Sequence, residues 1–273
     1  MGDSDHDKVF AGSIPKLYEE LLVPMIFAPY AKDIAGRLAR RPGLARVLEV
    51  AAGTGVVTRA LASTLPATVD IVATDLNAPM LDLARSLGTP RPVTWQVADA
   101  MALPFPDAAF DVVACQFGVM FFPDRAKAFA GMRRVLRPGG LLLFNAWDRI
   151  EDNEFADVVT ASLVALFPAD PPRFLARTPH GYHDKAAIAS DVARGGFAAA
   201  PRIDTLAARS PAKSPREPAV AYCHGTPLRN EIEARDAKRL DEATDAATAA
   251  LAARFGQGAI DGRIQAHVVA VER

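Results

Sequence analysis

A run of small residues between two apolar stretches is the first feature of this sequence that suits chemistry. Residues 47–58 read Val-Leu-Glu-Val-Ala-Ala-Gly-Thr-Gly-Val-Val-Thr, so an apolar strand would enter a loop around Gly53 and Gly55 and continue as a helix. Small residues let a ligand approach the backbone, and the start of a helix favours negative charge nearby. A dinucleotide site needs a third glycine at position 58, where this chain has Thr58. The run therefore predicts a nucleotide-type site, and a dinucleotide is the weaker interpretation.

Two acidic residues follow the next two apolar stretches. Asp75 lies 20 residues after Gly55, where a carboxylate can accept hydrogen bonds from both hydroxyls of a ribose. Asp99 follows the third stretch, and its carboxylate can accept a hydrogen bond from an adenine amino group. An isolated aspartate is more often a helix cap or a turn residue. In series with the loop, the two acids instead indicate a ligand that contains adenosine.

The elements that must position these residues alternate between strand and helix from Ala45 to Trp147. The expected strands are Arg46–Ala51, Val69–Thr74, Val93–Val97, Asp111–Gln116 and Leu141–Ala146. The expected helices are Val56–Leu65, Pro79–Leu87 and Arg125–Leu136, and Arg137–Gly140 reads as a tight turn before the fifth strand. Continuous apolar strands alternating with helices predict an α/β fold with a doubly wound, mostly parallel, Rossmann-like sheet.

The flanking segments are expected to add to this core. Pro15, Pro24 and Pro29 are expected to separate short helices at Lys16–Val23 and Ala31–Arg40. We therefore divide the chain into N-terminal lid helices (1–41), a cofactor-binding core (42–148) and a substrate cap with the last strands (149–273). In the third part the pattern is irregular over 149–183, and helical or strand patterns return at 185–194, 201–207, from Thr226-Pro227 onward, 240–255 and 265–271.

Five motifs resemble one known family in order and spacing. They are Glu49-x-Ala-Ala-Gly-Thr-Gly, Asp75-Leu-Asn-x-x-Met80, Asp99-Ala100, Leu103-Pro-Phe-Pro-Asp-x-x-Phe-Asp111 and Arg134-Val-Leu-Arg-Pro-Gly-Gly140. Over about residues 45–147 the chain resembles class I S-adenosylmethionine-dependent methyltransferases of the type 11 group, and it is similar to their ubiquinone/menaquinone C-methyltransferase subgroup. The resemblance implies a methyltransferase with S-adenosylmethionine as cofactor and S-adenosylhomocysteine as product.

The resemblance also implies roles for individual residues. The methionine part of the cofactor would lie against Ala51 and Gly53 and be anchored by Glu49, and Asp75 would hold the ribose. With Thr58 and a tyrosine of the expected lid added to the residues that the resemblance implies, the full set of expected cofactor-binding residues is Tyr18, Glu49, Ala51, Gly53, Thr58, Asp75, Leu76, Met80, Asp99, Ala100 and Gln116. Ala51 stands where the family usually has glycine. The quinone enzymes have an arginine in the loop that here reads Phe117–Phe122, which disfavours a quinone as the substrate.

The methyl acceptor is expected to be a small organic molecule bound by segments 149–183 and 216–230. These follow the fifth strand, and ligands of open α/β sheets bind beyond the carboxyl ends of the strands. The sequence leaves the catalytic base open; His180, His183 and His224 are the candidates, because histidine titrates near neutral pH. Two alternatives stay open: a dinucleotide-dependent oxidoreductase, and a module that binds S-adenosylmethionine without catalysis.

Composition narrows the setting. The net charge of -1 and the lack of a long basic block disfavour a nucleic-acid partner. No His, Cys or acidic cluster indicates a metal, and the two cysteines favour a reducing compartment. The acidic N-terminus lacks a signal-peptide pattern, and no apolar run is long enough to insert into a membrane. We therefore expect a cytoplasmic protein, and whether it forms a homodimer stays open.

Overall fold

The computed structural model describes residues 12–273, which divide into two compact units. The sheet unit comprises residues 28–146, 182–206 and 267–273, and the helical unit comprises residues up to 27, 147–181 and 207–266. These boundaries differ from the ones expected at 41/42 and 148/149. Residues 1–11, which include the first part of the expected lid and the N-terminus without a signal-peptide pattern, lie outside the described residues.

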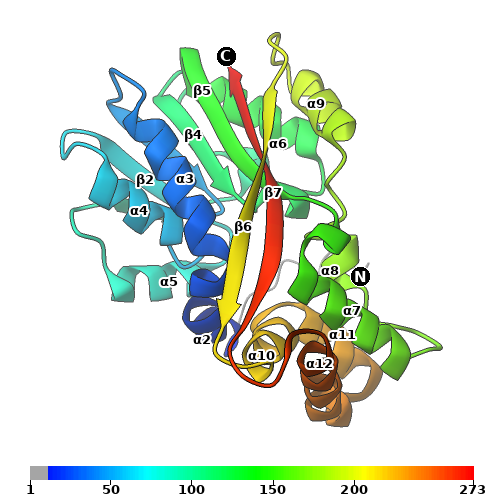
Figure 1. Cartoon of the computed structure of the whole chain (residues 1–273). Helices are drawn as coiled ribbons and strands as arrows, with labels where there is room; N and C mark the ends of the chain where they lie inside the picture. The colour runs from blue at the N-terminus through cyan, green and yellow to red at the C-terminus, as the bar shows by residue number, and fades with distance from the viewer. Residues whose placement is uncertain (1–11) are drawn as a thin grey trace. The chain divides into compact units, whose positions relative to one another are not determined.

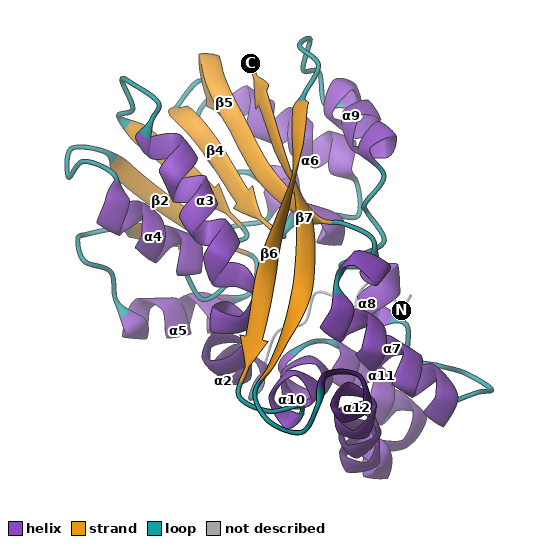
Figure 2. Ribbon diagram, viewed as in Figure 1, coloured by secondary structure: helices purple, strands orange, loops and turns teal. Residues whose placement is uncertain are grey.

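Seven strands form one sheet in the order β3-β2-β1-β4-β5-β7-β6 (Figure 2). The strands are β1 (Arg46–Val50), β2 (Asp70–Asp75), β3 (Thr94–Val97), β4 (Phe110–Gln116), β5 (Leu136–Trp147), β6 (Arg202–Ala212) and β7 (Ile260–Glu272). Strands β3, β2, β1, β4 and β5 are parallel. β7 runs antiparallel to β5, because Gly139 donates to Arg273 O while Arg273 donates to Gly140 O. The expected doubly wound, mostly parallel sheet is confirmed.

Helices cover both faces of the sheet in the sheet unit. They are α3 (Ala28–Ala39), α4 (Val56–Thr64), α5 (Ala78–Leu87), α6 (Arg125–Val135) and α9 (Lys185–Arg194), with single 3₁₀ turns η2 (Ala100–Ala102) and η3 (Val119–Phe121). α3 and α4 lie side by side (Figure 1), and Ile34 and Leu61 join Leu143 of β5 in one buried cluster. On the other face Phe129 of α6 packs on Phe144, with ring centroids 5.2 Å apart. Successive residues of β5 thus serve opposite layers.

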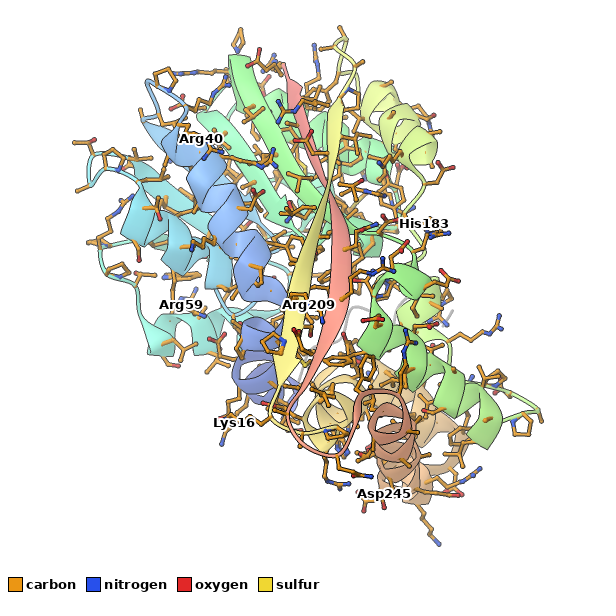
Figure 3. All side chains as sticks on the ribbon, viewed as in Figure 1. Lys16, Arg40, Arg59, His183, Arg209 and Asp245 are labelled. Atoms are coloured by element: carbon orange, nitrogen blue, oxygen red, sulfur yellow. The ribbon has the colours of Figure 1, made fainter. Side chains whose placement is uncertain are left out.

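In the part of the helical unit that the structure describes there are nine helical segments, together with Trp147 of β5 and parts of β6 and β7. The segments are α2 (Ile14–Leu17), η1 (Tyr18–Phe27), η4 (Ile150–Asp152), α7 (Glu154–Leu166), α8 (Phe174–Arg177), α10 (Arg216–Gly225), α11 (Leu228–Asp236), η5 (Ala237–Arg239) and α12 (Leu240–Phe255). α12 packs against α7 and α10. Within this unit Arg209 of β6, labelled in Figure 3, forms an ion pair of 3.0 Å with Asp261 of β7.

The prolines near the N-terminus do not separate helices as expected. Residues 14–39 are helical throughout, and the middle part, η1, is a π-helix that contains Pro24. A wider i→i+5 turn accommodates a residue that has no N–H to donate. Pro15 lies in the first turn of α2, where proline is tolerated. The prediction of two short helices with breaks at the prolines was therefore wrong.

Two further expectations were wrong. Residues 149–183 are not irregular, because α7 occupies residues 154–166 with Phe155, Val159 and Leu163 buried at four-residue spacing. The segment 137–140 is not a turn before the fifth strand but a bulge inside β5. β4 pairs Phe110 with Leu136 and then Val112 with Leu141, so five residues of β5 match two of β4.

α3 is part of the core of the sheet unit. Tyr30, Ile34 and Leu38 have no exposed surface, and the last two belong to the buried cluster with β1 and β4. Burial of such side chains is worth about 2 kcal/mol each. Deletion of residues 28–41 would thus remove a core layer, and the lid hypothesis stays a proposal for residues 13–27 alone.

Candidate functional site

The loop after β1 has an unusual backbone. Ala51, Gly53 and Gly55 all adopt positive φ, with values of 56°, 56° and 85°. The N–H of Ala52 donates to Thr74 O at 2.9 Å, which fastens the loop to the end of β2. A Cβ on Gly55 would lie 2.8 Å from the Trp95 ring, so glycine is required there for space as well as for conformation. The loop therefore presents bare backbone at the start of α4.

The Asp75 carboxylate joins the ends of β1 and β2. Its Oδ2 accepts the N–H of Gly53 at 2.8 Å, and its Oδ1 accepts the N–H of Asn77 at 2.8 Å. Burial raises the pKa of Asp75, and the N–H donors of Asn77 and Gly53 act in the opposite direction. Oδ1 also accepts Nδ2 of Asn77 at 3.4 Å, and a carboxylate offers about four acceptor positions in all. The side chain is thus held by several donors around residues 53 and 77 and can still accept from a ligand hydroxyl.

Glu49 is a buried carboxyl group on β1. Only 1% of its surface is exposed, and Thr58 Oγ1 donates to its Oε2 at 2.5 Å. Burial raises the pKa of Glu49 to about 8; the hydrogen bond from Thr58 lowers it, and the negative charge of Asp75 raises it further. A cation such as an α-ammonium group would stabilise the ionised form. Thr58, which stands where a dinucleotide site would have glycine, thus donates a hydrogen bond to this carboxyl group.

The ends of β2 and β3 expose apolar surface beside an acidic cap. Leu76 and Val97 are 50% and 48% exposed, which is unusual for large apolar side chains, whereas Met80 is buried. The backbone register pairs Asp75 with Val97, so Leu76 and Val97 lie at neighbouring strand ends. Asp99 is exposed and its Oδ1 accepts the N–H of Met101 at 2.8 Å, so it caps η2. The surface suits a flat heterocycle, with the second oxygen of Asp99 beside it.

The end of β4 fits closely against the loop after β1. Phe117 adopts a positive φ of 52°, as Ala51 does at the end of the neighbouring strand. A Cβ on Gly118 would lie 2.5 Å from Ala51 Cβ and 2.8 Å from Cys115 Sγ. Non-glycine residues with positive φ cost about 1–3 kcal/mol each and concentrate at functional sites. The methyl group of Ala51, at a place where glycine is usual in the family, therefore has room because Gly118 carries no side chain.

We expect Gly118→Ala to destabilise the protein by about 1–3 kcal/mol, because two carbons at 2.5 Å overlap and something must move. Ala51→Gly should recover part of that loss in the double variant, because the new Cβ would still lie 2.8 Å from Cys115 Sγ. Denaturant unfolding of the two single variants and the double variant measures this coupling. Additive effects of the two substitutions would contradict the fit between Ala51 and Gly118. Gly36→Ala is the matched control, because Gly36 lies in helix α3 and an added Cβ would meet only Arg40 at 3.8 Å. Gly88→Ala would not serve, because Gly88 has a positive φ.

The structure brings together most of the expected cofactor-binding residues. At the carboxyl edge of the parallel strands of the sheet unit lie Glu49, Ala51, Gly53, Thr58, Asp75, Leu76, Met80, Asp99, Ala100 and Gln116. Arg59 of α4, labelled in Figure 3, donates from Nη1 to Thr54 O at 2.6 Å and adds a positive charge beside the loop. Tyr18 belongs to the helical unit, where its ring stacks on Phe27 at 4.8 Å.

The three candidate histidines lie in different surroundings. His180 is buried, its Nδ1 lies 2.9 Å from Asp148 O, and its ring lies 5.9 Å from that of Trp147. His224 Nε2 lies 2.9 Å from Thr244 Oγ1, and burial lowers its pKa. Both belong to the helical unit, whereas His183 belongs to the sheet unit. The hydrogen-bond partners of His180 and His224 thus differ: a backbone carbonyl after β5 for the first and a hydroxyl of α12 for the second.

Four residues at this edge were missed by sequence reasoning. They are Asn77, which donates to Asp75; Val97, which exposes apolar surface; and the buried polar residues Thr54 and Asn145. Thr54 Oγ1 and both amide atoms of Asn145 have no hydrogen-bond partner among residues 12–273. Val97 carried a signal, since it is the last apolar residue before Asp99. Thr54 and Asn145 carried no such signal, because the hydrogen-bond partners of a side chain depend on tertiary contacts.

Two searches of the described residues concern metals and membranes. In residues 12–273 no group of three or more His, Cys, Asp or Glu side chains lies close enough to hold a metal ion. Of the helices in the same part of the chain, none has the length and apolar character needed to cross a bilayer.

Comparison with known proteins agrees with this geometry. Residues 48–144 match the model of a methyltransferase domain family. The chain is 32% identical over 165 residues to the ubiquinone/menaquinone biosynthesis C-methyltransferase UbiE of Stutzerimonas stutzeri, covering 56% of this chain and 64% of that protein. It is 31% identical to UbiE of Saccharophagus degradans, covering 56% and 67%. The chain thus spans 64% of the length of the first of these curated relatives and 67% of the length of the second.

A solved structure shares the fold over nearly the whole chain. The YcgJ protein from Bacillus subtilis superposes with a TM-score of 0.57 at 19% identity, covering 90% of this chain and 98% of that one. The matched family region, 48–144, contains the loop after β1, Asp75, Asp99 and Gln116, which are the residues that the geometry gathers at one edge. The chain therefore belongs to the class I S-adenosylmethionine-dependent methyltransferases, in the methyltransferase type 11 family.

Proposed function

We propose that this chain transfers a methyl group from S-adenosylmethionine to a small organic acceptor. The observation that carries the proposal is the row of groups along the carboxyl edge of the sheet. Asp99 follows β3, Asp75 is the last residue of β2 and Glu49 lies near the end of β1, and this spatial order suits an adenine, a ribose and an α-ammonium group in turn. The cradle fits the cofactor, since Gly55 has no room for a side chain and Thr54 holds an unpartnered buried hydroxyl among residues 12–273.

The cofactor supplies an electrophilic methyl group on its sulfonium, so the protein's task is alignment. Asp75 is fixed by two backbone donors and orients the ribose, and Glu49 is fixed by Thr58 and orients the ammonium group. Alignment of two reactants for in-line attack can supply about 7–11 kcal/mol of the barrier reduction. A general base is needed only when the accepting atom must lose a proton.

The relatives' printed names concern ubiquinone and menaquinone biosynthesis, and we do not propose a quinone acceptor for this chain. The support is the loop Phe117–Phe122, which carries no charged side chain. As acceptor-binding segments we propose 149–183 and 216–230, with His180, His183 and His224 as candidate bases, and residues 13–27 with Tyr18 as a lid. These proposals rest on the sequence pattern alone. A reducing compartment is supported by Cys115 and Cys223, which are buried free thiols.

The test uses the whole chain and two cofactors. We expect S-adenosylmethionine to raise the melting temperature and NAD to leave it unchanged, because Thr58, which donates to Glu49, stands where a dinucleotide site has its third glycine. Incubation with methyl-labelled cofactor and a small-molecule extract should then yield a labelled product. Stabilisation by NAD would favour the oxidoreductase alternative. Tight binding of S-adenosylmethionine with no labelled product would favour a non-catalytic binding module.

A further inference from the structure

Asn145 stands out among the buried polar residues of the sheet unit. It lies near the carboxyl end of β5 with no exposed surface, and neither Oδ1 nor Nδ2 has a hydrogen-bond partner among residues 12–273. Buried side-chain amides in folded proteins are nearly always hydrogen-bonded, because an unpaired polar group loses its hydration without compensation. An amide with both ends unpartnered calls for a ligand that pairs with it.

The face on which Asn145 lies follows from its neighbours. Leu143, two residues earlier on β5, belongs to the cluster beneath α3 and α4, and side chains two residues apart share a face of a strand. On β4 the same holds for Ala114 and Gln116, and the register pairs Gln116 directly with Asn145. Glu49 lies on this face as well, two residues after Val47 of the same cluster. Glu49, Gln116 and Asn145 are thus polar groups of one face at the ends of β1, β4 and β5.

The spatial order of the strands decides what Asn145 meets. With adenine at β3, ribose at β2 and the methionine part at β1, the next positions along the edge are β4 and β5. Neighbouring strands lie about 4.8 Å apart, so β5 is about 10 Å from β1 and beyond the cofactor. We propose that the Asn145 side-chain amide, beside Gln116, hydrogen-bonds the methyl acceptor and orients it; this rests on the methyl-transfer function proposed above.

The chemistry of the amide defines the class of acceptor. A primary amide donates and accepts at once and carries no charge, so it pairs with a neutral group that has a donor and an acceptor side by side. A phosphate or carboxylate would need a positive counter-charge when buried. The acceptor is therefore a neutral molecule with a hydroxyl, phenol or amide group near the methylated atom.

Asn145→Leu keeps the branched shape of the side chain and removes both polar ends. The melting temperature should stay level or rise by about 2–4 °C, because an unsatisfied amide is removed. The dissociation constant for S-adenosylhomocysteine, measured by calorimetry, should stay within about twofold. The value of kcat/KM for methyl transfer should fall by about 10- to 100-fold, as expected for the loss of one or two neutral hydrogen bonds. Asn145→Ala provides a second variant in case leucine is not accommodated.

The matched control is Asn153→Leu. Asn153 is also buried, but its Nδ2 donates to Arg149 O at 2.9 Å and to Gln265 O at 3.2 Å, and its Oδ1 accepts the N–H of Gln265 at 3.1 Å. This substitution leaves backbone groups unpaired, and its melting temperature should fall by several degrees. A similar fall for both Asn145 variants would show that the amide has structural partners, and it would overturn the proposal.

The transfer assay uses methyl-labelled S-adenosylmethionine with a panel of neutral phenols, hydroquinones and amides, and with phosphate esters and carboxylates for comparison. We expect the wild type to label a neutral compound. Three results would overturn the role of Asn145 and leave the methyl-transfer function standing. They are an unchanged kcat/KM in Asn145→Leu, preferred labelling of an anionic compound, and a loss of S-adenosylhomocysteine affinity that parallels the loss of kcat/KM. No labelled compound with the wild type, from the panel or from a small-molecule extract, would contradict methyl transfer itself and this inference with it.

Discussion

Asp75→Ala is expected to weaken the binding of S-adenosylmethionine by about 10- to 150-fold. Hydrogen bonds to a charged acceptor are worth about 1.5–3 kcal/mol, and 1.4 kcal/mol corresponds to a factor of ten in affinity. The structure places the expectation at the upper end, because Asp75 also holds the N–H of Gly53 at 2.8 Å and thereby the loop after β1. Calorimetric titration of the variant with S-adenosylmethionine and S-adenosylhomocysteine measures the loss.

Two further variants separate binding from folding. Asp75→Asn keeps one acceptor oxygen, so its affinity should lie between those of the wild type and Asp75→Ala. Asp82→Ala is the matched control, because Asp82 lies on the following helix, is largely exposed and pairs only on the surface with Arg85 at 2.8 Å. Its affinity should stay within about twofold. Unchanged affinity in Asp75→Ala would show that the carboxylate does not hold the ribose.

Cofactor affinity is expected to rise as the pH increases from 6 toward about 8, and to fall again at higher pH, where the α-amino group of the cofactor, with an ordinary pKa of about 7.7–8.0, loses its charge. The pKa of Glu49 is raised to about 8 by burial, so the carboxyl group is mostly protonated at pH 7 in the free protein. An ammonium group beside it favours the ionised form, so binding at pH 7 should release about one proton. Calorimetric titrations in buffers with different ionisation enthalpies measure the number of protons released on binding. Glu49→Gln should bind more weakly and release almost none.

The same carboxyl group makes the free protein less stable as the pH rises. The folded state keeps the proton up to about pH 8, whereas the unfolded chain releases it near the usual value of 4.5, so the unfolded state binds fewer protons in between. The contribution of Glu49 to the free energy of unfolding should therefore fall between pH 4.5 and 8, at up to about 1.36 kcal/mol per pH unit. Asp75, whose pKa burial also raises, adds to the fall. An equal slope in Glu49→Gln would show that Glu49 does not titrate in this range.

Asp99 has a structural role besides the proposed contact with adenine, since it caps η2 through the N–H of Met101. Asp99→Asn keeps an acceptor for that N–H and replaces the other oxygen by a donor. We therefore expect it to lower affinity for S-adenosylhomocysteine while the melting temperature changes little. An analogue without the adenine amino group should bind the variant and the wild type more nearly equally. A preference for adenine that is the same in both proteins would contradict the assignment.

The sequence by itself determined the sheet and most of the cofactor edge. Apolar strands of four to seven residues alternate with helices, and that local periodicity predicted β1 to β4 and their helices to within two residues. The small-residue loop and the acids at 75 and 99 stand at strand ends, where parallel strands place them on one edge whatever the rest of the chain does. The family motifs occupy this same stretch, 48–144.

Only the tertiary structure decided the features that depend on contacts between distant residues. The fit of Ala51 to Gly118, the hydrogen bond from Gly53 to Asp75 and the raised pKa of Glu49 each need strands that are far apart in sequence. A polar residue such as Asn145 reads as ordinary in the sequence, because only the packed core shows that its amide has no partner among residues 12–273. Local pattern thus determined which elements form, and long-range packing determined which of their polar groups are satisfied and which stay ready for a ligand.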